Sequence, residues 1–289
     1  MTADPSQHFV DIDGHRMSRW DEGPEHPRGT ILCVHGNPTW AEYYREVFDR
    51  FASRYRVVAP DHLGCGFSDR PEPGPDVAYT LAGHRDRLVK LVETLDLRDV
   101  TLVCHDWGGA IGMAAAAELR SRLRGIALLN TAAFPPPYIP WRIAACRTPV
   151  LGTIAIRGFN AFARAAIAMA MDRRKMPVEK ARQMLAPYDS WRNRLGIDHF
   201  VRDIPMTQRH RTHQTLQAVE SSLPEFANLP LALIWGMKDW CFRPECLRRF
   251  QRVWPDAEVT EIADAGHYVL IDAPEETGQA IERLLSRVA

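Results

Sequence analysis

The distribution of apolar residues along the chain predicts a sheet whose strands alternate with helices. Short apolar runs lie at residues 30–34, 55–59, 100–104 and 125–129, and residues 81–95 carry Leu and Val at helical spacing. Successive positions of these runs are apolar, rather than every second one, which is typical of strands that helices cover on both faces. The first half of the chain therefore favours a parallel sheet.

The same alternation returns towards the C-terminus, and a hairpin pattern precedes it at the N-terminus. Residues 231–235 and 258–262 have strand patterns, and helical patterns begin at Pro244 and Pro274. A hairpin that turns at Asp13-Gly14 adds two antiparallel edge strands before residue 30. We therefore predict an α/β fold with a mostly parallel eight-stranded sheet flanked by helices.

A segment of different character interrupts this pattern. Residues 131–222 combine Pro-rich turns with apolar helical stretches that hold many aromatic residues and methionines. We interpret this segment as an inserted helical lid. The predicted core domain then comprises residues 1–130 and 223–289, and the predicted cap domain comprises residues 131–222. A length of 289 residues allows one large domain with such an insertion.

Composition and charge exclude several classes of protein. Hydrophobic residues make up 46% and charged residues 25% of the chain, as in an average globular protein. The 36 Lys and Arg residues balance 36 Asp and Glu residues, so no global field attracts nucleic acid or an anionic membrane. We expect no nucleic-acid partner. No apolar run is long enough to span a bilayer, and the N-terminus lacks the pattern of a secretory signal.

Cysteine and glycine spacings argue against metals and nucleotides. The cysteines are scattered without the spacing of a metal site, and we interpret them as reduced thiols of a cytoplasmic protein: Cys33, Cys65, Cys104, Cys146, Cys241 and Cys246. The glycines match neither a dinucleotide fingerprint nor a phosphate loop. We therefore expect neither a cofactor nor a metal.

Residues 101–109 have the pattern of a nucleophile elbow, a strand that runs through a sharp turn into a helix at residues 110–119. Small residues flank the reactive side chain in this motif because the turn brings the backbone close to its neighbours. Asp106 occupies the nucleophile position and Gly108 follows it, whereas Cys104 stands where Gly is most common. The alternative is an ordinary turn in which Asp106 caps the helix.

An aspartate nucleophile selects the chemistry, because a carboxylate displaces a leaving group from carbon without prior deprotonation. Hydrolysis of the resulting ester needs a general base, and His267 follows a predicted strand directly. The alternative role for His267 is a loop residue bonded to the backbone. Asp239 lies just beyond residues 231–235 and is the candidate partner of His267, unless it is a surface turn residue. The other strand end that lies near such a site carries Asn130, which has no carboxylate.

A leaving anion also needs hydrogen-bond donors. Asn37 follows the strand at residues 30–34, and Trp107 follows Asp106, so both are expected beside the elbow. Each has a simpler explanation, as a turn Asn or a buried aromatic residue. The loop at residues 61–69 carries glycines that suit a tight turn, and we assign it a structural role.

Together the segments 35–40, 61–69 and 105–109 with Asp239 and residues 265–267 resemble the α/β-hydrolase superfamily, in particular the third subfamily of its haloalkane dehalogenase branch. This resemblance implies that Asp106 is alkylated, that His267 activates water, and that Asn37 and Trp107 bind the released halide. Asp239 matches the acid of the branch in which this residue follows the later strand.

Four lid segments, at residues 130–135, 157–162, 186–191 and 202–205, look like those of OleB-type β-lactone decarboxylases. The resemblance implies conversion of long-chain dialkyl β-lactones to an alkene and carbon dioxide in olefin biosynthesis, with a small apolar substrate and other olefin-pathway enzymes as partners. The alternative is a haloalkane dehalogenase. An epoxide hydrolase, with Tyr138 and Tyr188 as proton donors, ranks third, and a non-catalytic scaffold is the remaining hypothesis.

Aromatic residues and methionines of the lid are candidates for the wall of an apolar substrate pocket, although such residues are more often core. The candidates are Phe134, Trp141, Phe159, Phe162, Met169, Met171 and Trp191.

Overall fold

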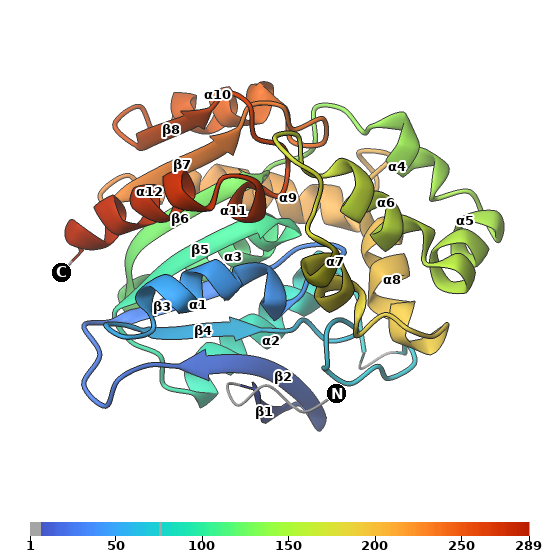
Figure 1. Cartoon of the computed structure of the whole chain (residues 1–289), viewed down its shortest axis with the longest axis horizontal. Coiled ribbons are helices and arrows are strands. Elements are labelled where there is room, and N and C mark those ends of the chain that lie inside the picture. The colour runs from blue at the N-terminus through green and yellow to red at the C-terminus, as the bar shows by residue number, and fades with distance from the viewer. Residues whose placement is uncertain (1–6, 75–76, 289) are drawn as a thin grey trace.

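The computed structural model describes residues 7–74 and 77–288, and an eight-stranded sheet runs through it (Figure 1). The strands are β1 (Gln7–Ile12), β2 (His15–Glu22), β3 (Thr30–Val34), β4 (Arg56–Pro60), β5 (Val100–Asp106), β6 (Leu123–Thr131), β7 (Leu231–Gly236) and β8 (Glu258–Ile262). Their order is β1-β2-β4-β3-β5-β6-β7-β8. The pairs β1·β2 and β2·β4 are antiparallel and the others parallel, which confirms the predicted sheet.

Helices cover both faces of this sheet, as the continuous apolar runs predicted. The covering elements are α1 (Arg45–Phe51), α2 (Leu81–Thr94), α3 (Trp107–Glu118), α10 (Pro244–Val253), α11 (Val269–Asp272) and α12 (Pro274–Ser286), with 3-10 turns η1 (Ala41–Tyr44), η2 (Arg120–Arg122) and η5 (Leu223–Phe226). In β3, Ile31 belongs to the buried apolar cluster that includes residues of α1 and α12, whereas Leu32 belongs to the cluster that includes residues of α2, α3 and α10. Every residue of β3 is buried, because both faces of the strand are covered.

Most of the short helices between residues 141 and 222 lie beyond the carboxyl ends of the parallel strands, whereas α9 lies beside the sheet-covering helices (Figure 1). The short helices are α4 (Trp141–Ala145), α5 (Leu151–Thr153), the π-helix η3 (Ile154–Gly158), α6 (Ala161–Met169), α7 (Val178–Leu185), η4 (Arg192–Arg194), α8 (Leu195–Asp203) and α9 (Arg211–Ser222). The last of these, α9, packs against α2 and α3 of the sheet-covering layer. The division into a core and a cap domain stays a prediction.

Two further features concern the membrane and the cysteines. Within residues 7–74 and 77–288, no helix combines the length and the apolar character that crossing a bilayer requires. All six cysteines are free thiols, and four of them are buried.

Candidate active site

The turn between β5 and α3 holds Asp106 in an unusual backbone conformation, with φ 54° and ψ −129°. Such a conformation costs a non-glycine residue about 1–3 kcal/mol and persists only where neighbours enforce it. The helix α3 begins immediately, at Trp107, rather than at residue 110 as expected. A Cβ atom at Gly108 would lie 1.8 Å from the Val34 carbonyl oxygen, so only Gly allows α3 to start this close to β3.

Cys104, the departure from the usual elbow pattern, is accommodated by a second glycine. A Cβ atom at Gly112 would lie 2.4 Å from the Cys104 sulfur. The larger side chain in the strand is therefore matched by the absence of one in the helix, one turn after the elbow.

The carboxylate of Asp106 has two different environments. Its Oδ1 accepts a hydrogen bond from the backbone N–H of Asn37 at 2.6 Å, and its Oδ2 lies 3.6 Å from Nε2 of His267. A Cβ atom at Gly36 would lie 2.0 Å from Oδ1, so this glycine lets the loop after β3 approach the carboxylate. One oxygen is thus held by the backbone, and the other remains beside the imidazole.

His267 joins Asp106 to Asp239, as the sequence suggested. Nδ1 of His267 lies 2.8 Å from Oδ2 of Asp239, which fits an N–H donated to the carboxylate. The backbone carbonyl of His267 also accepts a hydrogen bond from Nε2 of His105 at 2.9 Å. The ring is therefore oriented from both its side chain and its backbone.

Asn130, which the sequence offered only as a strand end without a carboxylate, is part of this arrangement. Its Nδ2 donates to Oδ2 of Asp239 at 3.0 Å, and its Oδ1 accepts from the backbone N–H of Gly236 at 2.8 Å. Oδ1 of Asp239 accepts from the backbone N–H of Cys241 at 2.6 Å. Sequence reasoning missed this role of Asn130, although its position at the neighbouring strand end was a usable signal.

The pKa values of Asp106 and His267 are shifted by the charged groups around them. Burial by itself raises the pKa of Asp106, but the hydrogen bond and charge of His267 outweigh burial and hold this pKa below its usual value. Burial by itself lowers the pKa of His267, but Asp239 and Asp106 outweigh burial and raise it to about 10. At neutral pH the resting site therefore contains an imidazolium between two carboxylates.

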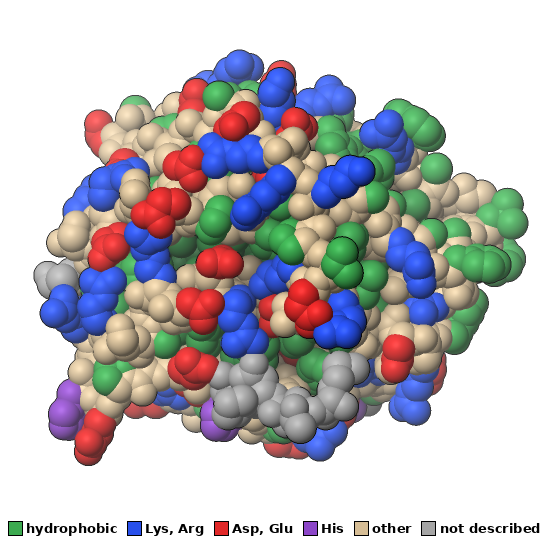
Figure 2. Space-filling model, in the orientation of Figure 1, with side chains coloured by type: hydrophobic (Ala, Val, Ile, Leu, Met, Phe, Trp, Pro, Cys, Tyr) green, Lys and Arg blue, Asp and Glu red, His purple; other side chains and the backbone are tan. Residues whose placement is uncertain are grey.

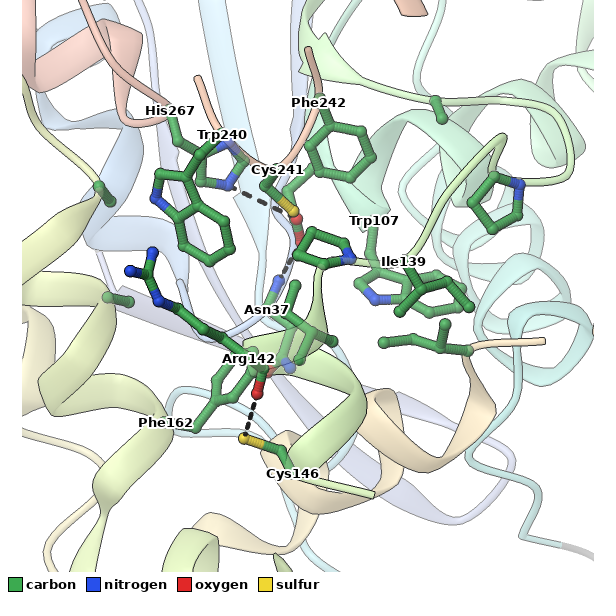
Figure 3. A pocket seen from close by; sticks show the side chains of 18 of the residues that line it. Asn37, Trp107, Ile139, Arg142, Cys146, Phe162, Trp240, Cys241, Phe242 and His267 are labelled. Carbon is green, nitrogen blue, oxygen red and sulfur yellow. Dashed lines mark hydrogen bonds and ion pairs between the residues drawn. The ribbon is translucent and has the colours of Figure 1, made fainter. Parts of the chain in front are cut away.

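A cavity of about 300 Å³ opens onto this group, and Figure 3 shows Asn37, Trp107 and His267 around it. Nδ2 of Asn37 makes only a long 3.4 Å contact with the Ile197 carbonyl oxygen, and the buried Oδ1 of Asn37 has no hydrogen-bond partner among the described residues. The ring of Trp107 packs against Phe200. The structure therefore brings the predicted anion-binding residues to the same wall of the cavity as Asp106.

The predicted pocket residues divide into two groups. Phe134, Phe162 and Met169 line the cavity, and Met171 does not. The predictions for Trp141, Phe159 and Trp191 are wrong, because these side chains are 75%, 72% and 47% exposed and lie outside it.

The physical reason for these errors is local backbone geometry. Trp141 and Ile143 lie two residues apart in α4, so they point to different sides, and Ile143 faces the cavity. Asn160 has a left-handed conformation (φ 54°) that separates η3 from α6 and breaks the spacing between Phe159 and Phe162.

Several cavity residues were not anticipated, among them Ile139, Arg142, Ile143, Cys146, Trp240, Cys241 and Phe242. The last three directly follow Asp239 in the chain, so adjacency to the proposed acid was a signal for them. The residues of α4 had no comparable signal.

The two tyrosines considered for epoxide opening are not paired at the site. Tyr138 lines the cavity, but its hydroxyl group donates to the Cys241 carbonyl oxygen and accepts from the Arg243 backbone. Tyr188 is buried outside the cavity lining, where its hydroxyl group donates to the Thr39 carbonyl oxygen at 3.0 Å.

Known proteins of similar sequence and structure agree with this fold. The alpha/beta hydrolase fold family matches residues 29–274. The chain is 37% identical to a cis-3-alkyl-4-alkyloxetan-2-one decarboxylase of Shewanella oneidensis (97% of this chain, 88% of the relative) and 39% identical to one of Xanthomonas campestris pv. campestris (95% and 93%). It is 31% identical to haloalkane dehalogenase 2 of Mycobacterium tuberculosis (94% and 92%).

A solved structure extends the similarity to the fold. The crystal structure of the haloalkane dehalogenase DatA from Agrobacterium tumefaciens C58 superposes with a TM-score of 0.86 at 24% identity, over 98% of this chain and 97% of that chain. With a family match over most of its length and this sheet order, the chain belongs to the α/β-hydrolase fold family.

Proposed function

We propose that this protein is a β-lactone decarboxylase, which converts long-chain dialkyl β-lactones to an alkene and carbon dioxide. The observation that carries the proposal is the near full-length similarity, at 37–39% identity, to two relatives whose names specify a dialkyl oxetan-2-one, which is a β-lactone. The apolar cavity beside Asp106 suits the alkyl chains of such a substrate.

In the proposed reaction, Asp106 attacks the saturated, alkyl-bearing ring carbon that is bonded to the ring oxygen. A carbon–oxygen bond forms to Oδ2 of Asp106, the ring carbon–oxygen bond breaks, and its electron pair remains on the new substrate carboxylate. The N–H groups of Asn37 and Trp107 are the proposed donors to this anion. The carbon–carboxylate bond then breaks, its electrons form the alkene, and Asp106 leaves as a carboxylate.

These two reaction steps consume no water, so the role of His267 in them differs from its role in ester hydrolysis. The imidazolium, 3.6 Å from Oδ2 of Asp106, stabilises the departing carboxylate in the second step. Asp239 and Asn130 are the proposed positioning residues for His267. Asp239 accepts the hydrogen bond from Nδ1 of His267, and Asn130 donates a hydrogen bond that holds Asp239 in this place. We also propose that residues 1–130 and 223–289 form the core domain and that residues 131–222 form the cap domain. A cytoplasmic location and association with other olefin-pathway enzymes also stay predictions.

The test is direct. Purified protein is incubated with a long-chain cis-β-lactone, and alkene is measured by gas chromatography beside an Asp106→Asn control. We expect alkene from the wild-type protein only. Alkene at or below the level of the Asp106→Asn control contradicts the proposal.

The second candidate is a haloalkane dehalogenase, which the 31% identity to haloalkane dehalogenase 2 and the shared anion-binding wall favour. Turnover in H₂¹⁸O separates the two reactions, because ester hydrolysis places ¹⁸O in Asp106 and decarboxylation does not. Mass spectrometry of the peptide that contains Asp106 reads the label. Halide release with label incorporation, and no alkene from lactone, would establish the second candidate instead.

A further inference from the structure

Nine large apolar side chains are exposed in the described residues, and six of them lie between residues 141 and 191 outside α7. We call this set the cap face, and its members are Trp141, Val150, Leu151, Ile154, Phe159 and Trp191. Their exposed fractions range from 42% to 75%. Leu151 and Ile154 are three residues apart in the continuous helical run of α5 and η3, so they share one side of it.

Positively charged residues are also concentrated in residues 131–222. Residues 131–222 contain 14 Lys and Arg against 6 Asp and Glu, a net charge of +8, so the rest of the chain carries −8. Between residues 131 and 171 there are four arginines and no acidic residue. The net charge of zero gives the whole chain no global field, but this part of the chain carries a local excess of positive charge.

Four arginines lie in the same stretch of sequence as the cap face: Arg142, Arg147, Arg157 and Arg164. None of them forms an ion pair with a carboxylate in the part of the chain that the structure describes. Arg157 lies over the ring of Trp191, with its guanidinium carbon 4.7 Å from the ring centroid. Figure 2 shows hydrophobic side chains gathered at the right-hand edge, where Figure 1 places α4 and α5, with Lys and Arg side chains beside them.

The helices of the cap face also form the wall of the active-site cavity. In α4, Trp141 is exposed and Ile143 lines the cavity, and in α6 Phe162 lines the cavity whereas Arg164 is exposed. A thin layer of helix therefore separates the cavity from this surface.

We propose that the cap face binds the surface of an anionic phospholipid bilayer. Exposed Trp, Phe and Leu side chains flanked by arginines are the composition that inserts into the boundary between headgroups and acyl chains. Anionic headgroups complement the excess of arginine, whereas a neutral or basic partner does not. The proposal goes beyond the proposed reaction and does not depend on it, but it would place a lipid phase, in which dialkyl substrates dissolve, beside the cavity.

The experiment measures sedimentation of the full chain with vesicles of phosphatidylcholine, with and without phosphatidylglycerol. We expect binding to the vesicles that contain phosphatidylglycerol and loss of binding at high salt, which screens the arginines. The variant Arg157→Gln/Arg164→Gln should lower this binding about twentyfold, because each basic residue near such a surface contributes a factor of about five. Binding that is absent, or equal for both vesicle types, overturns the proposal.

A second variant tests the apolar part of the cap face. Val150 has a positive φ of 63°, which Asp adopts more readily than Val, so Val150→Asp/Leu151→Asp adds charge without added backbone strain at residue 150. The matched control is Val178→Asp in α7, because Val178 is 86% exposed and lies outside the cap face. We expect the double variant to lose vesicle binding and the control to keep it, both with the circular dichroism spectrum of the wild type.

The competing occupant is a second copy of this chain. Analytical ultracentrifugation without lipid tests for this dimer. If the wild-type protein is a dimer, the Val150→Asp/Leu151→Asp variant is a monomer, and no vesicle binding is seen, the cap face serves self-association and the bilayer proposal is overturned.

Discussion

The charge of His267 depends on the carboxylates beside it. Two carboxylates, Asp106 at 3.6 Å and Asp239 at 2.8 Å, keep its imidazolium protonated in a buried place where a lone histidine would be neutral. The proposed ester on Asp106 would remove one of these negative charges and so lower the pKa of His267 during the reaction. In a hydrolytic reaction, this decrease in the pKa of His267 would make its neutral imidazole available as a general base only after the ester has formed.

The same pKa shift predicts how stability depends on pH. The pKa of His267 is about 10 in the folded protein and about 6.5 in an unfolded chain. Its stabilising contribution is therefore complete below about pH 6.5, decreases as the pH rises, and is lost as the pH passes about 10. The melting temperature of wild type minus that of His267→Gln, measured from about pH 6 to about pH 10, should shrink with rising pH. A constant difference would contradict the charged resting state.

A second prediction concerns the acid. Nδ2 of Asn130 lies 3.0 Å from the Asp239 oxygen that contacts Nδ1 of His267, so we expect a carboxylate at residue 130 to reach the imidazole when Asp239 is neutralised. We expect Asp239→Asn to lower kcat on the order of 10⁴-fold, as when a triad acid is neutralised. The double variant Asn130→Asp/Asp239→Asn should recover part of this loss. Steady-state kinetics of both variants provides the measurement, and a double variant no better than Asp239→Asn would show that only the β7 end can hold the acid.

The elbow between β5 and α3 shows how two elements share one constraint. Cys104 in the strand and Gly112 in the helix are complementary, because a Cβ atom on Gly112 has no room beside the sulfur. Gly108 meets backbone instead, at the Val34 carbonyl oxygen, which cannot move aside.

This complementarity predicts a rescue. Gly112→Ala alone should lower the free energy of unfolding by about 1–3 kcal/mol through overpacking. In the Cys104→Ala background the sulfur is gone, and Gly112→Ala should then be neutral or stabilising, because Ala favours a helix interior over Gly by about 1 kcal/mol. Urea unfolding of the four proteins tests it, and equal effects of Gly112→Ala in both backgrounds would refute the coupling.

The molecule as a whole places an apolar cavity between the sheet and the helices of residues 131–222. In α6, Ala165 lines this cavity, whereas Ala168 is exposed on the same helix. The size of one side chain on α6 therefore decides how much space the alkyl chains have.

Filling the cavity should change substrate preference. We expect Ala165→Phe to lower kcat/KM about tenfold or more for a long-chain β-lactone, because overpacking costs about 1–3 kcal/mol. A short-chain β-lactone should be affected less. Ala168→Phe is the control and should leave both values unchanged. Equal losses for both chain lengths would mean that α6 does not contact the alkyl chains.

Local patterns in the chain were sufficient to predict the sheet and to place the candidate catalytic residues near one another. The continuous apolar runs predicted strands buried on both faces. Asp106, Asp239 and His267 could be proposed as candidates because each lies at the carboxyl end of a strand or in the loop that follows it. Parallel strands bring their carboxyl ends to one edge, so position along the chain nearly determines position in space there.

In residues 131–222, position along the chain does not determine position in space in this way. Trp141 and Phe159 have the same apolar character as Phe134 and Phe162, and only the turn at Asn160 and the packing of α4 decided which of them reach the cavity. The contact of Asn130 with Asp239 likewise required knowledge of two strand ends at once. The order of residues along the chain was enough to bring the candidate catalytic residues to one edge of the sheet. The shape of the cavity and the exposed apolar surface arise instead from contacts between short helices whose directions no local pattern encodes.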